Sequence, residues 1–254
     1  MFSTMNDSLD DLRTAVAFLT RLPMPHPEGA KPSNFVRAHR MFPLVGAAIG
    51  GVVGLLCLTM RAIGLPDLAA AAIALGASAM LTGALHEDGL ADVADGFGGG
   101  RDAAAKLEIM RDSRLGTYGA LVLMVSFVIK VSALATLEDA FIVQSLVAAH
   151  ALARGVLPFM SMRMEYARKD GLAVNAGRPD STTSAIAAAL ALAIALLSLP
   201  LIDAFYAAVL AAVCAIGMER LAQWQIGGQT GDVLGGAEQI AETAILALLA
   251  ARLA

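Results

Sequence analysis

The sequence predicts an all-α integral membrane protein, a bundle of about six to seven transmembrane helices with an N-terminal amphipathic helix. Of the 254 residues, 57% are hydrophobic and only 16% are charged, whereas soluble domains carry about 25% charged residues. The apolar residues are gathered in runs of roughly the 20 residues that a helix needs to cross a bilayer. Because no linker or internal repeat divides the chain, we expect one membrane-embedded catalytic domain over residues 1–254.

The first expected element is an amphipathic helix over residues 6–22. Its apolar positions from Leu9 to Leu19 recur at helical spacing, and the charged residues between them make it too polar to cross a bilayer. We therefore place it on the membrane surface. Residues 23–40 hold four prolines and are expected to form a loop, because proline interrupts regular helix.

Seven apolar runs follow as candidate transmembrane helices. They are residues 43–60, 67–86, 117–137, 140–160, 184–202, 204–219 and 238–253. The fifth and sixth runs meet at residues 200–203, which predicts a tight hairpin. The last run is short and carries Glu238 and Glu242, so it departs furthest from an apolar span.

The lysines and arginines alternate between the loops that join these runs. Five precede the first run, four lie between the second and third, and four lie between the fourth and fifth, whereas the intervening loops hold Arg61 alone. Cytoplasmic loops of membrane proteins are enriched in Lys and Arg. We therefore expect a multi-pass protein of the cell inner membrane, with its N-terminus and its active site facing the cytoplasm.

Two basic residues lie inside the predicted spans. Lys130 stands in the third span, where extension of its ammonium group outward to the interface is favoured over a functional role. Arg154 stands near the cytoplasmic end of the fourth span, four residues after His150. For Arg154, pairing with a carboxylate and binding of substrate phosphate are equally open.

Acidic residues are concentrated after the second span, between Glu87 and Asp95. A helix here places Asp88, Asp92 and Asp95 on one face. Their mutual repulsion would be relieved by a divalent cation such as Mg²⁺, which takes carboxylate oxygens and shares them with substrate phosphates. The pattern therefore predicts a metal-assisted phosphoryl-transfer site, and the alternative is a solvated acidic helix end.

Three further polar segments fall on the same predicted side of the membrane. They are residues 111–116 (RDSRLG), 166–172 (YARKDGL) and 227–238 (GGQTGDVLGGAE). Arg111 is a candidate to hold phosphate oxygens, although juxtamembrane positive charge explains at least one arginine here. Asp232 is a candidate either to complete a metal site or to cap a helix.

These segments resemble the cobalamin synthase family, the adenosylcobinamide-GDP ribazoletransferases. The matching stretches are FLTRLPMP at 18–25, FPLVGAAIGG at 42–51, TGALHEDGLADVADGFGGG at 82–100, MRDSRLGTYG at 110–119, YARKDGL at 166–172 and GGQTGDVLGGAEQIAE at 227–242. The resemblance implies transfer of the cobinamide phosphoryl group from its GDP linkage to alpha-ribazole or its 5′-phosphate, with release of GMP and a requirement for Mg²⁺.

The pattern and the resemblance together define the candidate site. The catalytic candidates are His86, Asp88, Asp92, Asp95 and Arg111. The substrate-binding candidates are Gly99, Arg111, Ser113, Arg154, Arg168 and Thr230. The metal-ligand candidates are Glu87, Asp88, Asp92, Asp95, Asp112 and Asp232. The acceptor hydroxyl needs a base, and the sequence does not choose between His86 and a carboxylate.

Two other functions are compatible with the same residues. A lipid synthase similar to CDP-alcohol phosphotransferases has a related acidic element, but here Ala91-Asp92 stands where that signature has Ala-Arg. An ion-coupled transporter is less favoured, because its polar groups would gather near the bilayer midplane. The expected partners are adenosylcobinamide-GDP, alpha-ribazole or its phosphate, and membrane lipid, with no nucleic acid. Homo-oligomer formation is left open.

Overall fold

The computed structural model describes residues 2–25 and 32–254, and this part of the chain is helical, with an isolated β-bridge between Tyr166 and Gln229 in place of any strand. Six helices are long and apolar enough to cross a membrane. They are Phe35–Ala62, Thr117–Thr136, Asp139–Arg163, Ser181–Ser198, Leu201–Ile226 and Gly231–Leu253. The predicted fold class, an all-α multi-pass membrane protein, is confirmed.

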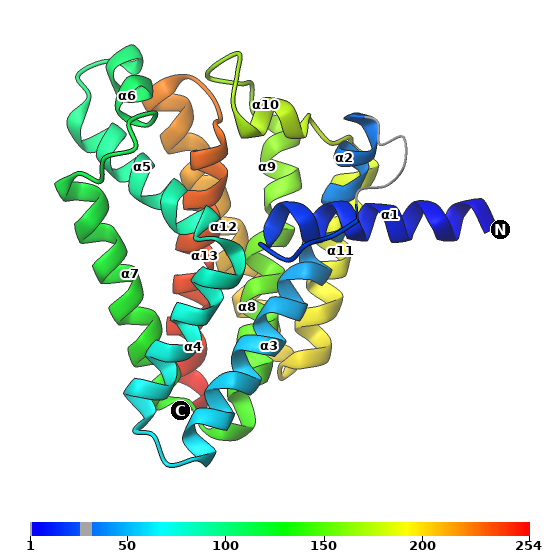
Figure 1. Ribbon diagram of the computed structural model, residues 1–254, viewed down its shortest axis with the longest axis vertical. Helices are drawn as coiled ribbons and strands as arrows, with labels where there is room; N and C mark the ends of the chain where they lie inside the picture. Colours follow the sequence, from blue (N-terminus) through cyan, green and yellow to red (C-terminus); the bar gives the residue numbers. More distant parts are fainter. Residues whose placement is uncertain (1, 26–31) are drawn as a thin grey trace.

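The elements follow one another along the chain as in Figure 1. They are α1 (Phe2–Leu19), α2 (Pro32–Ala38), the 3₁₀ turn η1 (His39–Met41), α3 (Phe42–Ala62), α4 (Asp67–Thr82), α5 (Leu85–Gly99), α6 (Ala103–Ile109), α7 (Thr117–Thr136), α8 (Asp139–Gly155), α9 (Leu157–Arg163), α10 (Leu172–Ala176), α11 (Ser181–Ser198), α12 (Leu201–Ile226) and α13 (Gly231–Leu253). The hairpin predicted between the fifth and sixth spans lies between α11 and α12.

The N-terminal helix α1 lies across the bundle rather than along it (Figure 1). It is held there by buried Asp11, which pairs with Arg37 and Arg40 at 2.9 and 2.7 Å. The prediction of a loop over residues 23–40 is wrong from Pro32 onward, where α2 and η1 form. Proline is accepted at a first helical position because the N–H that it lacks has no partner there. Residues 26–31 lie outside the described part.

The second predicted span, 67–86, is not one straight helix. Helix α4 ends at Thr82, and Gly83 and Ala84 then take left-handed backbone angles, with φ of 68° and 53°. Helix α5 leaves at 91° to α4, so the two helices meet the requirements of a span only when taken together. The bend turns the acidic stretch away from the direction of α4, so that it crosses one end of the bundle (Figure 1).

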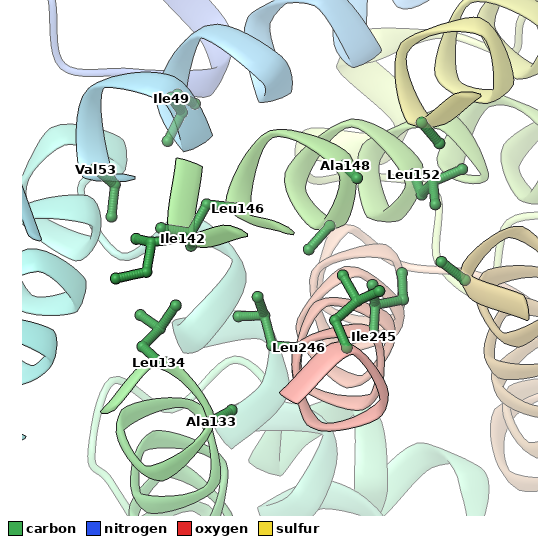
Figure 2. Close-up of a cluster of buried hydrophobic side chains, with 14 of the residues drawn as sticks. Ile49, Val53, Ala133, Leu134, Ile142, Leu146, Ala148, Leu152, Ile245 and Leu246 are labelled. Carbon is green, nitrogen blue, oxygen red and sulfur yellow. The ribbon is translucent and has the colours of Figure 1, made fainter. Parts of the chain in front are cut away.

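The centre of the bundle is formed by α8 and α13, whose most apolar windows are each 67% buried. Helix α3 packs closely on α8 because Gly46 and Gly50 face its backbone: a Cβ at either glycine would lie 2.4 Å from a carbonyl oxygen of α8. Figure 2 shows the apolar core between these helices. Its labelled side chains are Ile49, Val53, Ala133, Leu134, Ile142, Leu146, Ala148, Leu152, Ile245 and Leu246.

The last helix, α13, begins at Gly231, seven residues earlier than the predicted span, and it is among the most buried helices instead of the least secure one. The glycine-rich start of α13 packs closely against α5. A Cβ at Gly89 of α5 would lie 2.9 Å from the Asp232 carbonyl oxygen and 3.2 Å from the Gly235 Cα. The glycine-dense segment therefore serves close contact between α5 and α13.

The two ends of the bundle differ in their polar content. Figure 1 places α6, α10 and the start of α13 at the same end as α5, and the turn between α3 and α4 at the other end. At that other end, Arg61 pairs with Asp67 and Asp139 at 3.1 and 2.7 Å. The polar segments that the sequence assigns to one side of a membrane therefore do gather at one end of the structure.

Candidate functional site

Helix α5 carries the acidic row. The stretch from Glu87 to Gly96 is helical as predicted, so Asp88, Asp92 and Asp95 are spaced along one face. The first turn holds the acidic residues Glu87 and Asp88, which suits the positive end of the helix dipole. Asp88 is exposed, whereas Asp92 is half-buried.

Asp232 from α13 joins this row across the glycine contact. Asp88 and Asp232 line the same cavity. Asp92 is half-buried, and it lies close enough to Asp88, Asp232 and Asp95 for their charges to act on its carboxylate. Carboxylates that repel one another in this way form an oxygen donor set of the kind that Mg²⁺ binds. By their chemistry these residues suit a divalent cation. Among the described residues, the ligand atoms that all lie within 4.8 Å of one another belong instead to His150, Glu238 and Glu242.

Arg168 is the cationic side chain in contact with this group. Its Nη2 donates a hydrogen bond to Asp232 Oδ2 at 3.3 Å, and the Thr230 hydroxyl donates to the same oxygen at 3.1 Å. Within the described part of the chain, Arg168 Nη1 is buried without a hydrogen-bond partner. A buried unpaired donor is costly, so the geometry leaves this N–H available for an anionic ligand.

The loop that carries Arg168 is fixed against the start of α13. Gln229 N donates to Glu165 O at 2.8 Å, and Ala167 N donates to Gln229 O at 2.9 Å. The buried Gln229 side chain also donates to the backbone oxygens of Ser161 and Met164. Thr230 then caps α13 by accepting a hydrogen bond from Val233 N. These contacts explain how residues 166–172 and 227–238 come together.

Asp95 has a different set of partners from the other members of the row. Its two carboxylate oxygens accept hydrogen bonds from Gly116 N at 2.7 Å and Gly119 N at 2.9 Å. These are backbone donors at the start of α7, which a helix leaves unpaired. Asp95 therefore caps α7 from α5, and its role as a metal ligand stays a prediction.

The residues 111–113 lie on a surface loop beyond α6. Arg111 pairs with Asp170, which connects this loop to the 166–172 segment. Asp112 is partly exposed, and hydrogen bonds from Arg114 lower its pKa to about 2. Ser113 is exposed. In the described part of the chain, the hydrogen bonds and ion pair of the Asp112 side chain are with Arg114, so none of them joins it to the acidic row.

Gly99 and Glu87 lie away from the cavity that Asp88 and Asp232 share. Gly99 is the last residue of α5, and a Cβ there would lie 3.3 Å from the Ile109 side chain of α6. Glu87 lines a separate cavity together with Lys130 and Gln239. Neighbouring positions on a helix differ by about 100° in direction, which turns Glu87 away from Asp88.

Buried charged side chains from α5, α7, α8 and α13 form a network near the acidic row. Arg154 of α8 pairs with Glu238 of α13, and His150 Nδ1 lies 3.0 Å from Glu242. Lys130 of α7 donates to Gln239 at 2.7 Å and to Glu242 at 3.2 Å. The prediction that Lys130 extends outward is wrong, because the Glu242 carboxylate and the Gln239 amide oxygen give it partners in the interior.

The network extends to His86 at the start of α5. His86 Nδ1 lies 3.4 Å from both Glu238 Oε2 and Arg154 Nη2, and the residue also lines the cavity with Asp88 and Asp232. Arg154 is 1% exposed and engaged by these partners, which favours the pairing alternative over phosphate binding. The sequence predicted no partners for Glu238 and Glu242. Their i, i+4 spacing matches that of His150 and Arg154, and this shared spacing was the available signal.

Similarity to known proteins identifies the family of the chain. The sequence profile of the cobalamin-5-phosphate synthase family matches residues 11–250. The chain belongs to that family. It is similar to an adenosylcobinamide-GDP ribazoletransferase of Bradyrhizobium diazoefficiens, with 44% identity over 98% of this chain and 96% of the relative. It also resembles enzymes of the same description from Mesorhizobium japonicum, with 42% identity over 94% and 92% of the two chains, and from a Sinorhizobium species, with 39% over 97% and 98%. No solved structure matches.

In this member of the cobalamin-5-phosphate synthase family, the structure divides the predicted site into three groups. One group lies in or beside the carboxylate cavity: His86, Asp88 and Asp232 line it, and Asp92, Arg168 and Thr230 neighbour these carboxylates. A second lies on the surface loops and at the end of α5, and it consists of Gly99, Arg111, Asp112 and Ser113. The third consists of Glu87, Asp95 and Arg154, which contact or face other helices.

Proposed function

We propose that this chain transfers the cobinamide phosphoryl group of adenosylcobinamide-GDP to alpha-ribazole or its 5′-phosphate, with release of GMP. The reaction depends on Mg²⁺ and takes place at the cytoplasmic face of the inner membrane. The names of the full-length relatives support the substrates. The observation that carries the chemistry is that Asp88 and Asp232 line one cavity, with Asp92 close enough to both for their charges to act on it and with Arg168 bound to Asp232.

The carboxylates of Asp88, Asp92 and Asp232 are the groups that would hold Mg²⁺. When bound there, the ion supplies charge neutralisation for the pyrophosphate oxygens. The gathering of the Lys and Arg residues in the loops at this end of the bundle supports a cytoplasmic position for the site.

The side chains of the protein perform the remaining tasks. Arg168 offers its free Nη1 to a phosphate oxygen, and Arg111 offers a second guanidinium on the neighbouring loop. An acceptor hydroxyl attacks the phosphorus of the cobinamide phosphoryl group, and the bond to GMP breaks. His86, which lines the same cavity, receives the proton of that hydroxyl. Positioning and charge neutralisation account for most of the catalysis in such reactions.

The experiment compares Asp88→Asn, Asp92→Asn and Asp232→Asn with the parent enzyme for GMP release across a Mg²⁺ titration. Each change keeps the side-chain volume and removes a charge, so we expect at least about a hundredfold loss in rate. The matched control is Asp67→Asn, an aspartate at the opposite end of the bundle, which should leave the rate unchanged.

Thermal melting provides a second readout of the same site. Mg²⁺ should raise the melting temperature of the parent protein, because a ligand that binds the folded state stabilises it, and this shift should be lost in Asp92→Asn. If all three folded variants keep rates within a few-fold of the parent at unchanged Mg²⁺ demand, the metal site lies elsewhere. Absence of GMP release by the parent with every acceptor would contradict the proposed reaction.

A further inference from the structure

The cavity beside the carboxylates has two chemically different parts. Asp88, Asp232 and His86 line one part. The remainder is mainly apolar and includes side chains from α1, α3, α9 and α10, among them Leu157 and Ala176. The cavity has a volume of about 70 Å³, and it lies within about 650 Å³ of space between atoms that includes the open solvent at its mouth. Ligand sites of this kind commonly combine apolar walls with a few polar groups that fix orientation.

Aromatic rings form one side of the apolar part. Phe18 stacks on Phe42 with ring centroids 5.9 Å apart and an interplanar angle of 14°, and His39 stacks on Phe42 at 4.7 Å and 27°. His39 Nδ1 lies 3.0 Å from the backbone oxygen of Phe35 in its own preceding turn. Phe18, His39 and Phe42 all line the cavity, so these packed rings form an aromatic wall. Aromatic ligands pack favourably against such rings, in edge-to-face as well as offset-stacked arrangements.

The lining discriminates among the ring systems that the proposed reaction brings to the site. Guanine carries amide and amino groups along its edge, and burying them among apolar side chains would leave them unpaired at considerable cost. A corrin ring with its amide side chains is larger and polar at its rim. The dimethylbenzimidazole base of ribazole has an apolar, methylated edge and needs no hydrogen bond there.

We propose that this cavity binds the aromatic base of the acceptor nucleoside and turns the ribose of that nucleoside toward Asp88 and Asp232. This inference rests on the proposed function. The base occupies the apolar part between the aromatic wall and α10, and the acceptor hydroxyl then reaches the carboxylates. A lipid acyl chain would fill the same apolar part, but it has no group that uses the acidic part.

Ala176 of α10 provides the test, because it is buried at the cavity wall. Ala176→Leu should raise KM for alpha-ribazole about tenfold or more, since overpacking a close-fitting site weakens binding by that order. KM for adenosylcobinamide-GDP should stay unchanged. An alpha-ribazole analogue without the two ring methyl groups should recover most of the loss. The matched control is Ala189→Leu, the same change at an exposed position of α11.

Binding of alpha-ribazole, measured by equilibrium dialysis without the donor substrate, tests the inference separately from turnover. Binding by the parent and its loss in Ala176→Leu support the cavity even if no GMP is released. Ala173→Val adds two methyl groups to the same side of the cavity, and it replaces Ala176→Leu in the experiment if that variant does not fold. Unchanged alpha-ribazole binding in a folded filled variant, an equal rise in KM for both substrates, or failure of the smaller analogue to recover binding would overturn the inference.

Discussion

At the scale of single residues, Asp95 shows that equal spacing on a helix does not give carboxylates equal roles. It shares a face of α5 with Asp88 and Asp92, but its oxygens accept backbone hydrogen bonds from Gly116 and Gly119. Hydrogen bonds to a charged group each contribute roughly 1.5–3 kcal/mol. Asp95 is therefore bound to the start of α7 in a way that exposed Asp88 is not.

The pair Asp95→Asn and Asp88→Asn separates these two roles. We expect Asp95→Asn to lower the melting temperature clearly, because the amide retains one acceptor oxygen for two donors. Asp88→Asn should leave the melting temperature of the metal-free protein almost unchanged while it reduces GMP release. Equal melting temperatures for the two folded variants would show that the Asp95 cap adds little to stability.

A second prediction at the residue scale concerns the buried charge network. Lys130→Met should destabilise the protein by roughly 3–5 kcal/mol, because it leaves Glu242 buried beside one fewer cation. Arg163→Met is the matched control, since the Arg163–Glu219 pair lies on the surface and such pairs contribute little. Chemical or thermal unfolding in detergent measures both. A Lys130→Met protein as stable as the control would mean that His150 and Arg154 are sufficient partners for Glu242.

At the scale of elements, the contact of α5 with α13 decides where the carboxylates meet. Gly89 and Gly235 let the two backbones approach, and a Cβ at Gly89 would lie 2.9 and 3.0 Å from backbone atoms of Asp232. Those atoms are backbone atoms of α13, and its packing against several other helices prevents α13 from shifting by itself. The absence of a side chain at Gly89 therefore allows the acidic row to lie close to Asp232.

Gly89→Ala should therefore push α5 from α13 and reduce GMP release by more than tenfold, because misplacement by about 1 Å costs of the order of a hundredfold in such sites. Gly217→Ala in α12 is the matched control, since a Cβ there meets nothing within 4 Å. That control should be neutral or slightly stabilising. Activity of Gly89→Ala near that of the parent would show that the two helices have more freedom than their packing indicates.

At the scale of the whole molecule, the two ends of the bundle should face different sides of the membrane. Lys169 is exposed at the end that holds the carboxylate cavity, and Glu138 is exposed in the turn between α7 and α8 at the other end. The distribution of Lys and Arg predicts that the first end is cytoplasmic.

Single cysteines at these two positions, in a chain whose Cys57 and Cys214 are replaced by alanine, measure the orientation. In intact cells, a membrane-impermeant thiol reagent should label Glu138→Cys and leave Lys169→Cys unlabelled until the cells are opened. GMP release by each variant confirms that it is folded. The opposite labelling pattern would place the carboxylate cavity outside the cytoplasm.

The amino-acid sequence alone determined the properties that follow from local composition and periodicity. Long apolar runs predicted the membrane helices, and the spacing of Asp88, Asp92 and Asp95 predicted their common face. The motifs that carry the family resemblance lie in continuous segments. Each of these properties depends on residues within a few turns of the same helix. The residues at which a helix begins and ends are the feature that local sequence patterns predict least well.

Tertiary structure decided which distant side chains meet. The bend after Gly83 carries the acidic row across the bundle, and the glycine contact brings Asp232 to it. The buried Glu242 turns Lys130 inward, and the start of α7 engages Asp95. These outcomes depend on helix packing and on the need of every buried charge and backbone donor for a partner. Such partners are far apart in the sequence, and only the folded chain places them side by side.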